Sequence, residues 1–171
     1  MAGRERRQGD LLLRKGAERP LHDGEHLIMD GVVSVRTVGH ELALKAAAAA
    51  VATGAAAGCP VVAAVVGAGG DLVAFVRASG SPSPSAKIAQ DKAYSAASFR
   101  VPTPDLYAMV SGNPALRDGI VAQPGLAMFG GGLPIEIAGV FVGAIGVSGG
   151  SEAMDVEYAN AGLAAIGARQ F

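Results

Sequence analysis

The residues from Ala46 to Gly70 carry no charged side chain, and this stretch constrains the fold more than any other feature of the 171-residue chain. A charge-free stretch of this length belongs either in a bilayer or in a protein interior. Its composition favours the interior, because Ala and Gly contribute little to transfer into lipid and Gly58-Cys59-Pro60 interrupts any helix. We therefore predict a buried helix followed by a buried strand, and no membrane partner.

Charge is distributed unevenly along the chain. Fifteen of the 29 charged residues and all three histidines lie in the first 45 positions. This asymmetry predicts a polar, partly disordered extension over residues 1–36 and an apolar domain over residues 37–171. We expect the first twenty residues to be mobile and His26 to Val35 to form a short hairpin. The early apolar run is only three leucines long, which predicts no export signal and a cytoplasmic location.

The composition also restricts the class of partner. A formal net charge of −1 and the absence of Trp argue against nucleic-acid binding. A single cysteine, Cys59, excludes an internal disulfide and is typical of a reducing compartment. A mean hydropathy of +0.36 with few charges after Lys45 predicts a large apolar surface, and hence a homo-oligomer.

Helical and extended patterns alternate through the apolar domain. Helices are expected from Glu41 to Ala57, from Ser85 to Phe99, from Thr103 (a cap, with Pro104 in the first position) and from Asp155 to Ala168. Strands are expected at Val61 to Val66, Leu72 to Arg77, Leu126 to Phe129, Leu133 to Ile137 and Val140 to Val147, with a loop through Asn113-Pro114. This order predicts an α/β (α+β) domain with an antiparallel sheet of about five strands flanked by helices.

Three segments carry a family resemblance: VAAVVGAGGDLVAFVR, DKAYSAASFRVPTPDLYAM and GGGLPIEIAGVFVGAIGVSGGSEAMDVEYANAGLAAI. They are similar to the defining segments of the GlcG/HbpS family, which includes haem-binding proteins, the glycolate-operon proteins and a PduO C-terminal domain. The resemblance covers about Thr37 to Gly167 and implies a profilin-like fold and frequent oligomerisation. It implies a small-molecule-binding function, with haem as the leading candidate ligand and cofactor.

The resemblance also points to a ligand site around Arg100-Val101-Pro102-Thr103. Thr103 matches a position at which a family member can present a threonine to haem iron, a weak metal ligand, while Arg100 is suited to pairing a carboxylate. The turn Gly130-Gly131-Gly132 is the other half of the expected ligand-binding site, because its backbone N–H groups are suited to receiving an anion. The structural alternatives are a helix-capping threonine, a surface arginine and glycines that only permit a tight corner.

Lys92 and Glu136 are the candidate catalytic residues, and Lys92 is also a candidate ligand-binding residue. Lys92 lies in the resembling helix, while Lys87 and Asp91 are spaced as an ordinary surface ion pair. Glu136 lies in PIEIAG, either on a solvated sheet face or as a general base in a pocket. These residues leave open an alternative function: a cofactor-independent enzyme acting on a small organic acid or carbonyl metabolite. A purely structural oligomer subunit is a third hypothesis, and whether the protein is an enzyme stays undecided by the sequence.

Overall fold

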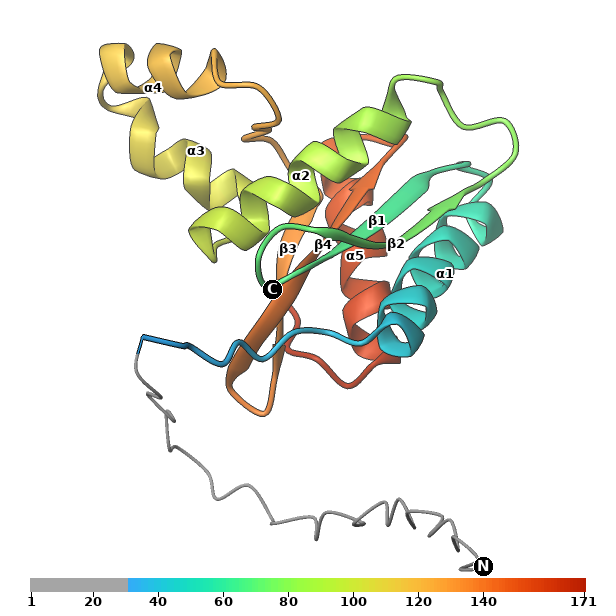
Figure 1. Ribbon diagram of the computed structural model, residues 1–171. Helices are drawn as coiled ribbons and strands as arrows, with labels where there is room; N and C mark the ends of the chain where they lie inside the picture. Colours follow the sequence, from blue (N-terminus) through green and yellow to red (C-terminus); the bar gives the residue numbers. More distant parts are fainter. Residues whose placement is uncertain (1–30) are drawn as a thin grey trace, which may run out of the picture. The chain divides into compact units, whose positions relative to one another are not determined.

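The computed structural model describes residues 31–171, of which Val35–Phe171 form one compact unit and residues 31–34 belong to a separate unit, Met1–Ser34. The expected hairpin from His26 and the expected mobility of the first twenty residues fall mostly or wholly outside the described residues. Within residues 31–171 the helices are α1 (His40–Ala56), α2 (Ser85–Phe99), α3 (Thr103–Ser111), α4 (Pro114–Val121) and α5 (Glu152–Ala165). The strands are β1 (Val62–Gly67), β2 (Leu72–Arg77), β3 (Gly132–Ile137) and β4 (Val140–Ser148) (Figure 1).

These strands form one antiparallel sheet in the order β2-β1-β4-β3. The central strand β1 is buried along its whole length, which explains its unbroken apolar sequence. Val62 pairs with Arg77 of β2 on one side and with Ser148 of β4 on the other. The predicted α+β class, with an antiparallel sheet flanked by helices, is confirmed, but the described residues contain four strands rather than five.

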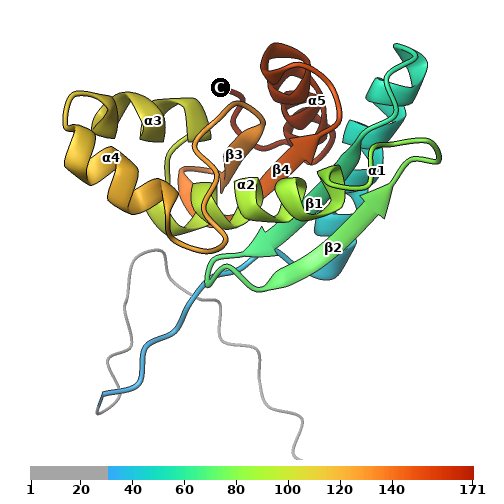
Figure 2. The same ribbon diagram turned by 90° about the horizontal axis from the view of Figure 1, so that it is seen from above.

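Helices cover both faces of the sheet. Helices α1 and α5 pack together on one face, and α2 crosses the other (Figure 2). Small residues permit very close packing: a Cβ on Gly146 of β4 would lie 2.0 Å from the Ala89 carbonyl oxygen of α2. A Cβ on Gly162 of α5 would lie 2.8 Å from the Ala46 carbonyl oxygen of α1. The many Ala and Gly residues therefore set a short spacing between the layers.

Helices α3 and α4 form a hairpin beside the sheet (Figures 1 and 2). A small apolar cluster holds its base and contains Leu106, Val110 and Met128. Helix α4 corrects our expectation of a loop: the Asn113 side chain accepts a hydrogen bond from the Leu116 amide (3.2 Å), and Pro114 takes the first helical position.

The expected strand from Leu126 to Phe129 is wrong. This segment is irregular because the Ala127 amide donates to the Ser95 hydroxyl of α2 (2.8 Å), which removes that amide from any strand pairing. By contrast, the predicted bounds of α2 and β2 are confirmed. Within residues 31–171, no helix has the length and apolar character needed to cross a bilayer.

Candidate functional site

Arg100 ends helix α2 in a left-handed backbone conformation, with φ 56° and ψ 33°. Its side chain is exposed, and its guanidinium lies 5.0 Å from the centre of the Phe141 ring on β4. This stacking stabilises an arginine that has turned out of the helix. Arg100 therefore lies over the face of the sheet that α2 covers.

Thr103 is fully buried, and its hydroxyl is occupied. The hydroxyl donates to the Phe129 carbonyl (2.7 Å) and accepts from the Gly132 amide (3.1 Å). Our expectation that Thr103 caps α3 is wrong, because the helix already begins at Thr103 and its preceding residue is Pro102. The threonine joins α3 to the start of β3, and binding a metal through the same oxygen would require breaking these contacts.

The turn Gly130-Gly131-Gly132 is also occupied by protein groups. The Gly130 amide donates to the Glu152 carboxylate (2.7 Å), and the Gly131 carbonyl accepts from the Val147 amide (2.8 Å). Gly131 has a φ of +117°, and a Cβ there would lie 2.5 Å from the Val147 carbonyl oxygen. The crowding at this corner therefore requires glycine. The amides of Gly130 and Gly132 already donate to acceptors within the protein.

Lys92 lies beneath that turn, 1% exposed, and makes a buried ion pair with Asp155 of α5 (2.7 Å). Its ammonium also donates to the Val147 carbonyl (2.9 Å) and lies 4.7 Å from the centre of the Phe129 ring. Burial lowers the pKa of Lys92 below its usual value, while Asp155 opposes that shift. Asp155 additionally accepts from the Gly150 amide (2.9 Å), so this pair ties α2, β4 and α5 together.

Glu136 lies near the end of β3, next to an irregularity in the strand register. It is partly exposed and pairs with Arg169 (3.1 Å), which fits the solvated-face interpretation. The expected surface pair between Lys87 and Asp91 is confirmed on α2. Because both candidate catalytic groups, Lys92 and Glu136, have charged partners, neither is a free general base in this arrangement.

An apolar pocket of about 320 Å³ lies where the start of α3 meets β3 and α5, and we call it the proline pocket. Its lining residues are Pro102, Pro104, Asp105, Leu133, Val156 and Phe171. It adjoins both halves of the expected site, since Pro102 and Pro104 flank Thr103 and Leu133 follows Gly132. None of our predicted site residues lines it; their neighbours do. No sequence signal marks Val156 or Phe171 as lining residues, because both come from a distant part of the chain.

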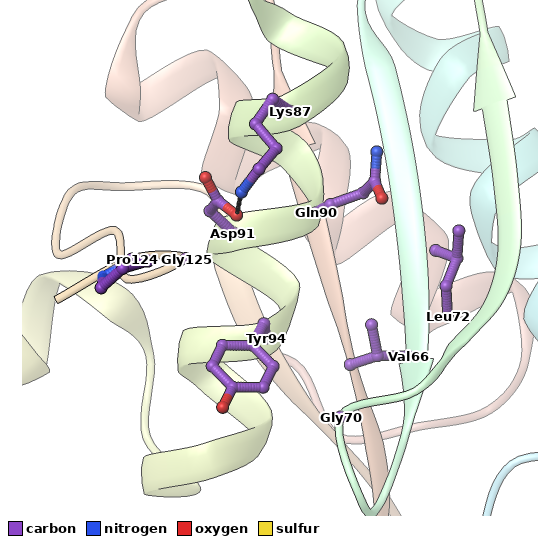
Figure 3. A pocket seen from close by; sticks show the side chains of 9 residues that line it. All are labelled: Val66, Gly70, Leu72, Lys87, Gln90, Asp91, Tyr94, Pro124 and Gly125. Carbon is purple, nitrogen blue, oxygen red and sulfur yellow. Dashed lines mark hydrogen bonds and ion pairs between the residues drawn. The ribbon is translucent and has the colours of Figure 1, made fainter.

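A second pocket, of about 280 Å³, lies between α2 and the β1–β2 turn (Figure 3). Lys87, Gln90, Asp91 and Tyr94 come from α2, whereas Val66 and Leu72 come from the strands. Lys87 and Asp91 neutralise each other, and the Gln90 amide donates to the Ala86 carbonyl (2.9 Å). The polar groups of this second pocket are thus largely engaged with one another, which makes the proline pocket the better candidate site.

The described part of the chain offers no cluster of three or more His, Cys, Asp or Glu side chains suited to a metal ion. His40 is exposed at the start of α1, while His22 and His26 lie outside the described residues. None of the residues that line the proline pocket carries a nitrogen or thiolate ligand for iron.

Comparisons with known proteins agree with this architecture. A family model described as "Haem degrading protein HbpS-like" matches residues 38–164. A crystal structure of a double mutant of Streptomyces reticuli HbpS is 32% identical, with a TM-score of 0.72, over 86% of this chain and 97% of that one. The structure of a PduOC:heme complex is 29% identical, with a TM-score of 0.71, over 80% and 99% of the two chains.

A curated relative from Citrobacter freundii shows the same similarity in sequence. It is an uncharacterised 15.0 kDa protein from the dhaT-dhaS intergenic region, 35% identical over 97 residues, which are 56% of this chain and 68% of the relative. The family match extends from just before α1 to the last turn of α5 and so includes the whole sheet. The chain therefore belongs to the HbpS-like family.

Proposed function

We propose that this protein binds a flat, largely apolar ring ligand in the proline pocket, and that haem is the leading candidate. The observation that supports this most directly is the pocket itself, where five apolar residues and one carboxylate line about 320 Å³. This volume lies at the lower end of the range for small-molecule sites, and the apolar lining is typical of them. The similarity to HbpS and to a protein solved as a heme complex supports a tetrapyrrole as the ring.

The residues present fit the ring of haem better than its iron. Apolar surface gains about 25 cal/mol for each Å² removed from water, so contact with Pro102, Pro104, Leu133 and Phe171 favours a macrocycle. An iron ligand is not available in the same way, because the Thr103 hydroxyl makes two hydrogen bonds within the protein. Binding through ring contact, with no iron bond required, is therefore our proposal.

Asp105 gives the proposed complex an orientation. It is the charged residue of the pocket lining and is exposed, so it repels the carboxylates of a porphyrin. The acidic edge of the ligand should therefore point away from Asp105 and toward solvent. Replacing Asp105 by Asn should tighten binding of an acidic porphyrin, by about two- to fivefold at low salt, because one exposed repulsion is removed.

Titration with hemin and with metal-free protoporphyrin IX tests this function. Ring contact predicts that both bind saturably, with dissociation constants within about fivefold of each other, as measured by absorbance and by porphyrin fluorescence. Hemin binding more than about a hundredfold tighter than protoporphyrin would instead show that an iron bond dominates. In that event Thr103→Ser should preserve the haem spectrum and Thr103→Val should change it. No saturable binding of either compound would refute the proposal.

We further propose that the protein acts as a homo-oligomer in the cytoplasm. The single cysteine is typical of a reducing compartment. Apolar side chains on α3 and α4 are open to solvent, with Met109 69% and Val121 61% exposed, and such surfaces favour self-association.

A further inference from the structure

The last residues of the chain fold back against the proline pocket. The Arg169 amide donates to the Glu136 carbonyl (2.9 Å), which attaches the segment to the end of β3. The Arg169 side chain pairs with the Glu136 carboxylate (3.1 Å), and its guanidinium lies 4.6 Å from the centre of the Phe171 ring. Phe171, which lines the pocket, is thus held from the side of β3.

Helix α5 holds the same residue through one side chain. The Asn160 amide group donates to the Phe171 carbonyl (2.7 Å), and its oxygen accepts from the Phe171 amide (2.9 Å). These two hydrogen bonds hold the Phe171 backbone at its amide and at its oxygen. We call Asn160, Arg169 and Phe171 the C-terminal clasp.

We propose that Phe171 is the aromatic wall on which a flat ligand stacks, and that Asn160 is the positioning residue that holds this wall in place. This inference rests on the proposed function and adds the residue that selects for flatness. Phe171 is 37% exposed and lines the proline pocket, so part of this residue is accessible to a ligand there. Stacked aromatic rings gain more than their buried area alone provides, which favours a planar ring over an aliphatic ligand of equal size.

The clasp explains why an exposed phenylalanine can act as a defined wall. An unrestrained side chain loses rotational freedom when it binds a ligand, and that loss weakens binding. Asn160 holds the Phe171 backbone and the Arg169 guanidinium lies against the ring, so less ordering remains to be imposed by a ligand. Neither residue lines the pocket, so both act through Phe171.

Two fluorescent probes test the clasp in the full chain: protoporphyrin IX and the neutral planar dye Nile red. Phe171→Leu removes the flat ring but keeps an apolar side chain, and we expect about three- to tenfold weaker binding of both probes. Asn160→Ala should weaken binding to a similar extent. Phe99→Leu is the matched control, because Phe99 is 40% exposed on α2 and lines neither pocket, and it should bind like the parent.

A double-mutant cycle separates positioning from a general structural effect. If Asn160 acts through Phe171, adding Asn160→Ala to Phe171→Leu should cause little further loss of affinity. Full additivity of the two losses would show that Asn160 does not position the ring. Thermal unfolding of each variant identifies any that fail to fold, and Phe171→Leu alone then still decides the role of the wall.

The outcomes distinguish the clasp from the proposed function. If the parent binds protoporphyrin and Phe171→Leu behaves like Phe99→Leu, the clasp inference is wrong and the proposed function stands. If protoporphyrin does not bind but Nile red binds in a Phe171-dependent manner, the clasp stands for smaller ring ligands and the tetrapyrrole proposal is wrong. If the parent binds neither probe, both are wrong.

Discussion

Lys92 and Asp155 are both charged and almost fully buried, so their ion pair matters for the stability of the domain. Replacing Lys92 by Met would remove the hydrogen-bond donor that the buried Asp155 carboxylate and the Val147 carbonyl share, and we expect a loss of about 3–5 kcal/mol in the free energy of unfolding. Asp155→Asn keeps an oxygen for the Gly150 amide. Combined with Lys92→Met, it should cost clearly less than the sum of the two single losses. Urea denaturation measures all four proteins, and strictly additive losses would contradict the ion pair.

The same lysine predicts a dependence of stability on alkaline pH. Burial holds the pKa of Lys92 in the folded state below the usual 10.5 of the unfolded chain. Between these two values the unfolded chain binds more protons, so the contribution of Lys92 to the free energy of unfolding rises with pH. The stability of the parent relative to Lys92→Met should therefore increase as the pH rises toward 10.5. A difference that falls over this range, in urea denaturation at a series of pH values, would contradict the lowered pKa.

At the scale of elements, glycine has opposite roles in the turn before β3 and in helix α4. Gly131→Ala places a Cβ against the Val147 carbonyl in a left-handed conformation and should destabilise the protein by more than about 2 kcal/mol. Gly119 lies inside the exposed helix α4, and a Cβ there meets nothing within 4 Å. Gly119→Ala should therefore stabilise α4 by about 0.5–1 kcal/mol. Equal effects at the two positions, in thermal or urea unfolding, would contradict these assignments.

The errors in our predicted elements have local causes. The start of helix α4 is encoded in the sequence by an Asn cap followed by Pro in the first helical position. The same Asn-Pro pair is also typical of loops, which is the interpretation given above. The expected strand from Leu126 to Phe129 has an apolar sequence, but its Ala127 amide donates to the Ser95 hydroxyl of α2 and the segment pairs with no strand of the sheet. Hydropathy reports that a segment is buried, and it does not report which neighbour buries it.

At the scale of the whole molecule, exposed apolar side chains predict self-association. Tyr107, Met109, Leu116 and Val121 on α3 and α4 are all more than 45% exposed. Each of these side chains is an apolar group that contact with a second copy of the chain could cover. Sedimentation at micromolar concentration should therefore show a species heavier than 17.0 kDa. A single monomeric species over a tenfold concentration range would contradict this.

The sequence by itself determined the family and most of the helices and strands of the domain interior. The closing helix, expected from Asp155 to Ala168, instead runs over Glu152–Ala165. The charge-free stretch after Lys45 contains most of α1 and all of β1, and the Ser, Pro and Gly residues that flank α2 and β2 predict the bounds of these two elements. These features are local, because burial and turn chemistry are encoded within a few residues. The family resemblance likewise depends on contiguous segments, and the match over residues 38–164 confirms it.

Only the tertiary structure decided what the candidate site residues contact. Lys92 is a candidate catalytic or ligand-binding residue by sequence, but the fold brings Asp155, 63 positions away, into an ion pair with it. Thr103 is a candidate iron ligand by sequence, but its hydroxyl is hydrogen-bonded to the Phe129 carbonyl and the Gly132 amide. The proline pocket combines Pro102 with Leu133 and Phe171, which belong to separate elements. Such contacts form between residues that are far apart in the sequence. They depend on how helices and strands pack against one another, which local sequence patterns do not specify.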